Sequence, residues 1–189
     1  MNWFPLWNSL RISAISTVLT FFIGIWAALL VTRANRALKG LLDTLLTLPL
    51  VLPPTVIGFF ILIVAGPKGP VGSLMKQWFA LTITMRWQAS VIAVTIITFP
   101  LMYRTVRAAF DAFDMNLIYA GQTLGLSDIY LFWRVLLPNC RDAILAGAVL
   151  SFARGLGEYG ATSMVSGYIA GRTATISTSV AHFWQIGQD

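Results

Sequence analysis

Two ionisable residues stand inside an apolar stretch of this sequence, at helical spacing. Arg154 and Glu158 are four positions apart, so on a helix they would share one face and could form an ion pair. Ionisable groups in an apolar helix are costly and usually face protein or a water-filled cavity. Two interpretations stay open: an ion pair that fixes this helix against its neighbours, or a polar lining of a cavity.

Other reactive side chains are few. His182 is the only histidine and Cys140 the only cysteine, so neither an intrachain disulfide nor a thiolate or histidine metal cluster can form. The apolar stretches offer no His or Asp pair for acid–base catalysis, and no GxxxxGK[ST] nucleotide-binding motif occurs. We therefore expect no enzyme activity, no metal, no cofactor and no nucleotide site in this chain.

A segment rich in hydroxyls near the end of the sequence contains a single cation. Arg172 is followed by Thr173, Thr175, Ser177 and Thr178. Hydroxyls around limited fixed charge suit an oxyanion that must also leave again. A segment of this composition is, however, more often a solvated loop. Direct contact of Arg172 and Thr173 with an anion is thus a hypothesis, and a solvated loop is its alternative.

The composition indicates that much of this chain is surrounded by lipid. Of its 189 residues, 57% are hydrophobic and 11% are charged, whereas a soluble domain carries about 25% charged residues. The net charge of +6 does not indicate nucleic acid, because the basic residues are scattered singly between long apolar runs. We expect an all-α integral membrane protein of the cell membrane with several spans and no nucleic-acid partner.

Four apolar runs are long enough to cross a bilayer, which takes roughly 20 residues. They lie near 12–32, 44–65, 87–103 and 143–165. The second run contains Pro49, Pro53 and Pro54, which we expect at an end of the span or against protein, because they free backbone carbonyls. Tyr168–Asp189 is predicted to be a loop, followed by a re-entrant or surface helix.

The region 104–142 between the third and fourth runs is polar. It holds four basic and four acidic residues. Its apolar positions recur at helical spacing, which predicts short helices at the membrane surface. The basic residues that flank the spans are balanced between the two sides, so the positive-inside rule does not orient the chain.

Residues 119–138, YAGQTLGLSDIYLFWRVLLP, resemble the conserved cytoplasmic loop of ABC importer permeases. The family pattern is EAA, three residues, Gly, nine residues and Ile-x-Leu-Pro. Gly125 matches the glycine, and nine residues separate it from Val135 in the Ile position; Tyr119 replaces the usual Glu, so one acidic contact of the pattern is absent. The expected coupling-loop residues are Ala120, Gly121, Gly125, Leu126, Ser127, Val135, Leu137 and Pro138.

The resemblance implies that this loop docks on a separate ATPase subunit and transmits its closure to the spans. Gly125 would permit a sharp turn between two short helices, and Pro138 would stand where a new helix begins. An ion channel that needs no ATPase is the alternative from another class, but it gives no reason for this spacing.

Three further stretches resemble molybdate-type permeases, and sulfate permeases have closely related segments. The stretches are LTLPLVLPPTVIGFF (46–60), LSFARGLGEYGAT (150–162) and SGYIAGRTATIS (166–177). The resemblance implies translocation of molybdate, with tungstate or sulfate and thiosulfate as alternatives. The expected residues of the translocation path or gate are Arg154, Glu158, Tyr159, Thr162, Ser163, Arg172 and Thr173.

The same resemblance implies an assembly and an orientation. It implies a type I permease core that pairs with a second copy as a homodimer, because one copy of four spans cannot enclose a pore. Two ATPase subunits would dock under 104–142, and an extracytoplasmic binding protein would deliver the oxyanion. The N-terminus would then lie outside. Members of the family continue past a segment like 173–189 into one more span, so we expect the final helix to be missing from this sequence.

Overall fold

The computed structural model describes residues 3–79 and 82–187, and within these ranges every regular element is a helix. The all-α fold expected from the composition is confirmed. In chain order the elements are α1 (Phe4–Arg33), α2 (Arg36–Val51), α3 (Pro54–Ala65), α4 (Pro70–Phe79), α5 (Trp87–Ala112), α6 (Asn116–Thr123), α7 (Asp128–Leu131), a π-helical turn (Phe132–Leu136), α8 (Leu137–Asn139), α9 (Arg141–Leu156), α10 (Gly160–Val165) and α11 (Ile176–Gln185).

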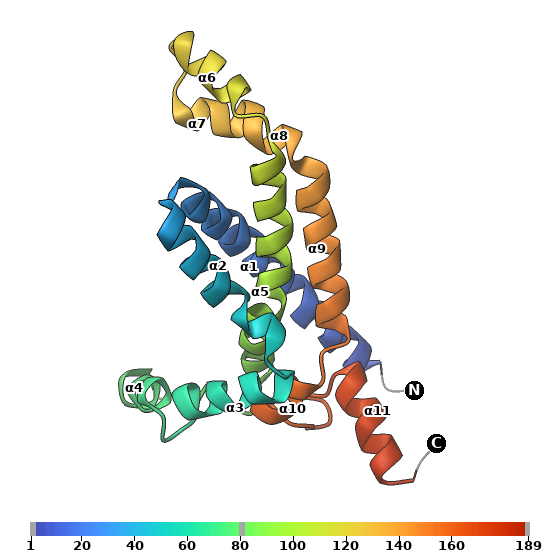
Figure 1. The fold of residues 1–189 in the computed structure, drawn as a ribbon. Helices are drawn as coiled ribbons and strands as arrows, with labels where there is room; N and C mark the ends of the chain where they lie inside the picture. Colours follow the sequence, from blue (N-terminus) through green and yellow to red (C-terminus); the bar gives the residue numbers. More distant parts are fainter. Residues whose placement is uncertain (1–2, 80–81, 188–189) are drawn as a thin grey trace.

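The helices α1, α5 and α9 form the body of the molecule and pack against one another (Figure 1). Ala28 of α1 and Ile144 of α9 are buried in the shared core. Met102 of α5 fills the space between the helices: a Cβ on Gly24 would lie 2.8 Å from its Cγ, and one on Gly147 would lie 3.0 Å from its Sδ. Close approach through small residues is typical of helix packing in membranes.

Two of the four expected spans are broken helices. The run 44–65 divides into α2 and α3, whose axes differ by 106°. Pro54 takes the first position of α3, where its missing N–H costs no hydrogen bond. The run 143–165 is also interrupted, because α9 ends at Leu156 and α10 begins at Gly160. Tertiary packing explains the second break: Ala161 and Val165 of α10 are buried against α3 and α5.

Among the described helices, α1 and α5 are each long and apolar enough to cross a membrane. Two bent pairs, α2 with α3 and the run Asp128–Asn139 with α9, raise the number of spans to as many as four if each pair is one span. Helix α5 is longer than the expected run 87–103. Residues 104–112 continue it instead of forming a separate surface helix, because Val106 and Phe110 are buried in the core. The prediction of short helices applies from α6 onward.

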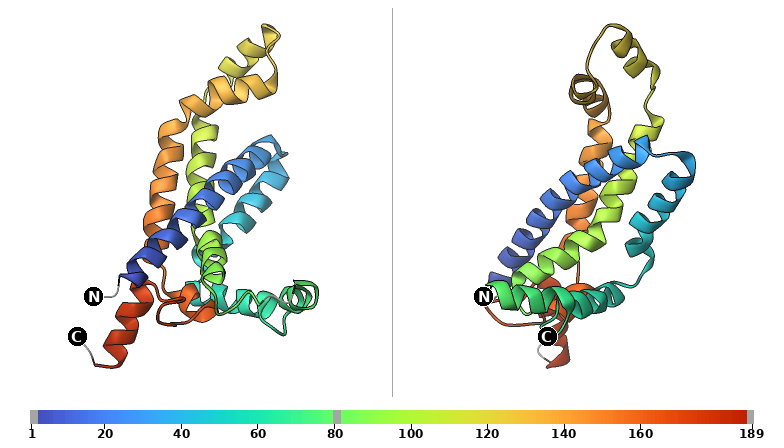
Figure 2. Two further views of the ribbon diagram at one scale, coloured as in Figure 1. Left: turned by 180° about the vertical axis from the view of Figure 1, so that it is seen from behind. Right: turned by 90° about the vertical axis from the view of Figure 1, so that its left-hand side faces the viewer.

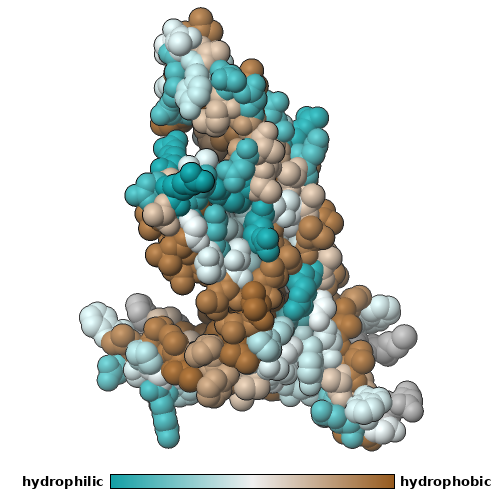
Figure 3. Space-filling model, viewed as in Figure 1, coloured by the Kyte–Doolittle hydropathy of each residue, from teal (hydrophilic) through white to brown (hydrophobic). Residues whose placement is uncertain are grey.

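The chain reaches two opposite ends of the body (Figures 1 and 2). The start of α1 lies at one end with α3, α4 and α10, which we call the N-terminal end. Helices α6 and α7 lie at the other, the loop end. In Figure 3 hydrophilic residues gather over the upper part of the molecule, whereas hydrophobic residues predominate across the lower middle.

Candidate functional site

The loop end is built by α6 and α7, which are joined by a sharp turn at Gly125. Its φ of +78° is a left-handed conformation, which glycine adopts without a Cβ clash. Gln122 Nε2 donates to Asp128 Oδ1 at 2.9 Å, and the Leu126 N–H donates to the Gly121 carbonyl at 3.1 Å. These bonds close the turn that the spacing predicted.

Ser127 and Pro138 lie at the two ends of the helical run Asp128–Asn139, which we call the second arm of the loop. The Ser127 hydroxyl caps α7 by accepting the Tyr130 N–H at 3.3 Å. From Asp128 the helical run continues without interruption to Asn139 and then bends by 69° before α9. Pro138 therefore lies in the first turn of the three-residue helix α8, rather than at the start of the long helix that follows.

Gly121 stands where the family pattern has a second alanine, and the packing supplies a reason. Leu131 of α7 is buried directly against Gly121, and a Cβ on Gly121 would collide with the Cδ2 methyl of Leu131. The neighbouring Ala120 is exposed, whereas Val135 and Leu137 of the second arm are half-buried. Gly121 thus allows α6 and α7 to pack closely.

The tip of the loop exposes large apolar side chains at an otherwise hydrophilic end of the protein. Leu124 and Ile129 are 79% and 75% exposed. A cluster of exposed apolar side chains with a polar rim is typical of a protein–protein contact. We call this set the loop tip: Leu117, Tyr119, Leu124, Ile129, Tyr130 and Trp133.

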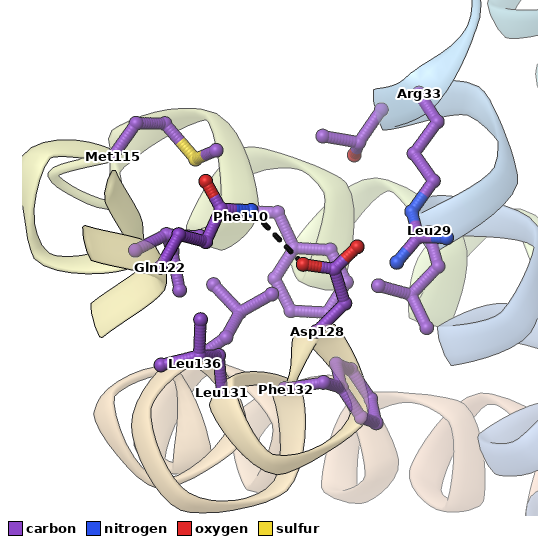
Figure 4. A pocket seen from close by; sticks show the side chains of 11 residues that line it. Leu29, Arg33, Phe110, Met115, Gln122, Asp128, Leu131, Phe132 and Leu136 are labelled. Carbon is purple, nitrogen blue, oxygen red and sulfur yellow. Dashed lines mark hydrogen bonds between the residues drawn. The ribbon is translucent and has the colours of Figure 1, made fainter. Parts of the chain in front are cut away.

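A pocket of about 170 Å³ lies between the loop and the end of α1 (Figure 4). Leu29 and Arg33 line it from α1, and Gln122 and Asp128 line it from the loop. Figure 4 shows Arg33 on the side of the pocket where the Asp128 carboxylate lies. The loop is therefore not packed tightly on α1, which leaves room for a shift between them.

Arg154 and Glu158 form the ion pair that their spacing predicted, with 2.8 Å between Arg154 Nη1 and Glu158 Oε2. The helix ends at Leu156, so Glu158 lies in the break and not inside a continuous helix. Its Oε1 accepts the Ala161 N–H at 3.0 Å and so satisfies the first turn of α10. The Glu158 side chain is 1% exposed and that of Arg154 is 39% exposed.

The other path candidates on α10 use their hydroxyls locally. Thr162 Oγ1 lies 3.0 Å from the carbonyls of Glu158 and Tyr159, and Ser163 Oγ donates to the Gly160 carbonyl at 2.9 Å. Thr162 is buried, Ser163 is half-buried and Tyr159 is exposed. Of these three side chains, Tyr159 is thus the most accessible to a solute.

Arg172 and Thr173 are adjacent in sequence but differ in setting. Thr173 is buried, and its hydroxyl accepts the Ile169 N–H at 3.0 Å and donates to the Gly167 carbonyl at 3.2 Å. Arg172 is exposed. Among the described residues, no hydrogen bond or ion pair connects Arg172 with Arg154 or Glu158. No polar contact therefore joins these two groups of expected path residues within the described part of the chain.

Sequence reasoning missed a charged network between α2 and α5. The Arg107 side chain is buried, with 6% of the residue exposed, and forms ion pairs with Asp111 and, at 3.8 Å, with Asp43. Each carboxylate has a second partner: the Tyr103 hydroxyl donates to Asp43, and Lys39 Nζ lies 3.5 Å from Asp111 Oδ1. The i, i+4 spacing of Arg107 and Asp111 was a sequence signal for the ion pair between these two residues, but not for the contacts with α2. Across 3–79 and 82–187, no three His, Cys, Asp or Glu side chains form a group that could hold a metal ion.

The comparisons with known proteins agree with this architecture. The family described as "Binding-protein-dependent transport system inner membrane component" matches residues 20–181. The chain is 38% identical to the molybdenum transport system permease protein ModB of Escherichia coli (strain K12) over 179 residues, which is 95% of this chain and 78% of that protein. It is 34% identical to the putative molybdenum transport system permease protein YvgM of Bacillus subtilis (strain 168), over 93% of this chain and 78% of that protein.

A sulfate permease and a solved transporter are also similar. The sulfate transport system permease protein CysW of Escherichia coli (strain K12) is 35% identical over 93% of this chain and 60% of its own length. A chain of the MetNI methionine ABC transporter, solved in inward-facing conformations, superposes with a TM-score of 0.75, covering 98% of this chain and 81% of that one. At 16% identity, this last likeness concerns the fold alone.

Proposed function

The chain belongs to the family of binding-protein-dependent transport system inner membrane components, and from this premise we propose that it translocates molybdate through a membrane. It is the permease subunit of an ABC importer with the fold of a type I permease. In this family a separate subunit hydrolyses ATP and a binding protein supplies the substrate. The choice of molybdate is supported by the similarity to two molybdenum permeases over more than nine tenths of this chain.

The loop tip supports the proposal that ATP hydrolysis in a separate subunit drives transport by this protein. Leu124 and Ile129 are the most exposed of its apolar side chains, and they stand beside a turn fixed by Gly125. A rigid turn that presents apolar groups suits insertion into a groove of the ATPase subunit. The pocket behind the loop lets the loop tilt against α1 when that subunit closes. ATP binding and the loaded binding protein would then each favour one of two arrangements of the helices.

The proposal includes an orientation and a second copy. With the loop end in the cytoplasm, the N-terminal end faces outside, together with the 66–86 segment and the binding protein. Two copies enclose the path at their interface, because α1, α5 and α9 of one copy pack into a filled core. Exposed apolar residues such as Phe22, Phe59 and Val149 cover the outer surfaces that lipid or the second copy would contact.

The ion pair of Arg154 and Glu158 is proposed to border the path as part of its gate. A carboxylate on the path would repel an oxyanion, but here the carboxylate is buried and the guanidinium is its accessible partner. An anion would therefore meet Arg154 before Glu158, and Tyr159, which follows Glu158 in the sequence, is also exposed. Arg172 and Thr173 make no polar contact with this pair and would act nearer the entrance, where Thr173 holds the loop and Arg172 is exposed.

A transport assay tests this function. The permease is reconstituted in liposomes with its ATPase and its binding protein, and ATP hydrolysis and uptake are measured with molybdate, tungstate or sulfate. Molybdate should stimulate both most strongly. Stronger stimulation by sulfate would favour the second candidate, which the likeness to CysW supports. Stimulation by none of the three would refute the oxyanion proposal, and uptake without ATP would favour a channel.

A further inference from the structure

Arginines from three segments line adjoining hollows at the N-terminal end. Arg11 lies on α1, Arg86 directly precedes α5, and Arg172 lies on the loop after α10; all three are exposed. Arg11 and Arg172 line a hollow of about 270 Å³, and Arg86 and Arg172 line a second of about 300 Å³. Trp87 lines both hollows. Like charges brought together in this way repel one another unless an anion lies between them.

The described part of the chain supplies no such anion. The ion pairs found among these residues involve Lys39, Arg107, Arg141 and Arg154 as cations, and none involves the three arginines at the N-terminal end. Neither hollow has an Asp or a Glu in its lining. The cluster therefore carries positive charge that is not neutralised by any described carboxylate.

The segments that carry the arginines are fixed by buried contacts. Asn8 Nδ2 of α1 donates to the Ala174 carbonyl at 3.0 Å, and the Ile176 N–H donates to Ser9 Oγ at 2.9 Å. Both Asn8 and Ser9 are buried. These bonds hold the loop with Arg172 against α1, within one turn of Arg11. The hollow between these two arginines is thus a feature of the fold.

Trp87 and Met85 fix the positions of Arg11 and Arg86. The Arg11 guanidinium lies 3.7 Å from the centroid of the Trp87 ring, a cation–π contact. The contact uses the face of the guanidinium, so the N–H groups at its edge remain available to an oxyanion. The Met85 N–H donates to the Val165 carbonyl at 3.0 Å, which anchors the segment that leads into Arg86.

We propose that Arg11, Arg86 and Arg172 bind one tetrahedral oxyanion, the phosphate of an anionic phospholipid. A guanidinium offers paired N–H donors that match phosphate oxygens. Arg11 lies about 10 Å along α1 from its first residue, Phe4, at 1.5 Å per residue. With 30 residues, α1 is about 45 Å long, the thickness of a bilayer with its headgroups. A helical side chain tilts toward the N-terminus, so the long Arg11 side chain can place its guanidinium in the headgroup layer.

The surroundings favour a lipid over a free oxyanion. Trp3 and Trp7 at the start of α1 are 67% and 71% exposed, and tryptophan prefers the membrane–water interface. Val18 and Phe22, seven and eleven residues after Arg11 on the same face of α1, are exposed and offer apolar surface to an acyl chain. Free molybdate or phosphate would gain nothing from these apolar groups. The site does not depend on which substrate the permease transports.

Native mass spectrometry of the purified, delipidated full chain tests the proposal. The chain is titrated with phosphatidylglycerol or phosphatidylcholine, and the affinity for the first bound lipid is measured. Arg11→Gln and Arg172→Gln should each weaken phosphatidylglycerol binding by about tenfold, the value of one charge-assisted hydrogen bond. Arg172→Lys, which keeps the charge, should lose less. Arg36→Gln, an exposed arginine away from this cluster, is the matched control and should change the affinity less than about twofold.

Three outcomes would overturn the lipid assignment. The first is binding of phosphatidylglycerol no tighter than that of phosphatidylcholine, and the second is a loss of affinity in Arg36→Gln as large as in the cluster variants. Displacement of the lipid by inorganic phosphate or molybdate at equal concentration would assign the arginines to a free oxyanion. Because the lipid measurement involves no transport, its failure is distinguishable from failure of the proposed function; thermal unfolding in the same detergent checks that each variant is folded.

Discussion

Arg154 and Glu158 form an ion pair in which the carboxylate is buried and the guanidinium is partly accessible. The atoms Nη1 and Oε2 are 2.8 Å apart, and the second carboxylate oxygen caps α10 through the Ala161 N–H. The two partners are therefore not equivalent. Loss of Arg154 leaves a charge buried without its counter-ion, whereas loss of the charge on Glu158 leaves an exposed cation that water can solvate.

Arg154→Gln should destabilise the permease more than Glu158→Gln does. We expect Arg154→Gln to lower the free energy of unfolding by about 2 kcal/mol, between the values for exposed and buried pairs. In Glu158→Gln the amide oxygen can still accept the Ala161 N–H, so the loss should be about 1 kcal/mol. Thermal unfolding in detergent measures both variants, and equal losses would contradict the asymmetry.

Glu158→Gln should also uncouple transport from ATP hydrolysis if the pair belongs to the gate. In reconstituted liposomes we expect a lower uptake of molybdate per ATP than in the unchanged permease. Exposed Ala153→Ser, on helix α9 beside Arg154, is the control and should leave this ratio unchanged. A ratio equal to that of the unchanged permease in Glu158→Gln would reduce the pair to a structural role.

The network between α2 and α5 predicts that two arginines on one helix differ in their effect on stability. Arg107 is buried between Asp43 and Asp111, whereas Arg104, three residues earlier, is exposed. Arg107→Gln should cost about 2 kcal/mol, between the values for exposed and buried pairs, because the guanidinium is buried but its two carboxylate partners are partly exposed. Arg104→Gln should change stability by less than about 0.5 kcal/mol. Similar unfolding temperatures for the two variants would show that the network contributes little.

The spacing of the loop motif predicted local structure well, because the turn needs a residue that tolerates positive φ and Gly125 provides it. Long-range packing was less accessible to sequence reasoning. The hydropathy of 143–165 predicted a single span. A hydropathy average carries no information on tertiary contacts, such as the packing of Ala161 on α3 or the capping of α10 by Glu158. Arg107 and Asp43 are 64 positions apart, and no local pattern connects them.

Gly125→Ala should weaken the loop turn, because alanine at a φ of +78° has a Cβ too close to the backbone. We expect a cost of about 1 kcal/mol for the turn and a several-fold weaker affinity for the ATPase subunit. Gly40→Ala is the matched control: Gly40 lies within α2 with nothing within 4 Å of an added Cβ, so alanine should stabilise that helix slightly. Unchanged ATPase affinity in Gly125→Ala would show that this turn geometry is dispensable.

The loop tip should lose its partner when its apolar groups are made polar, while the fold remains intact. Leu124 and Ile129 are about three quarters exposed, so Leu124→Ser and Ile129→Ser remove little buried surface from the permease itself. Burial of these side chains in the ATPase groove would contribute about 1–2 kcal/mol each, so each substitution should weaken the complex by about tenfold. Val71→Ser, an exposed apolar position on α4 at the N-terminal end, should leave that affinity unchanged.

Co-purification with the ATPase and its titration onto the reconstituted permease measure the affinities. Equal binding by all three variants would place the ATPase contact elsewhere, whereas selective loss in the two loop variants would identify the loop tip as the surface that receives the energy of ATP.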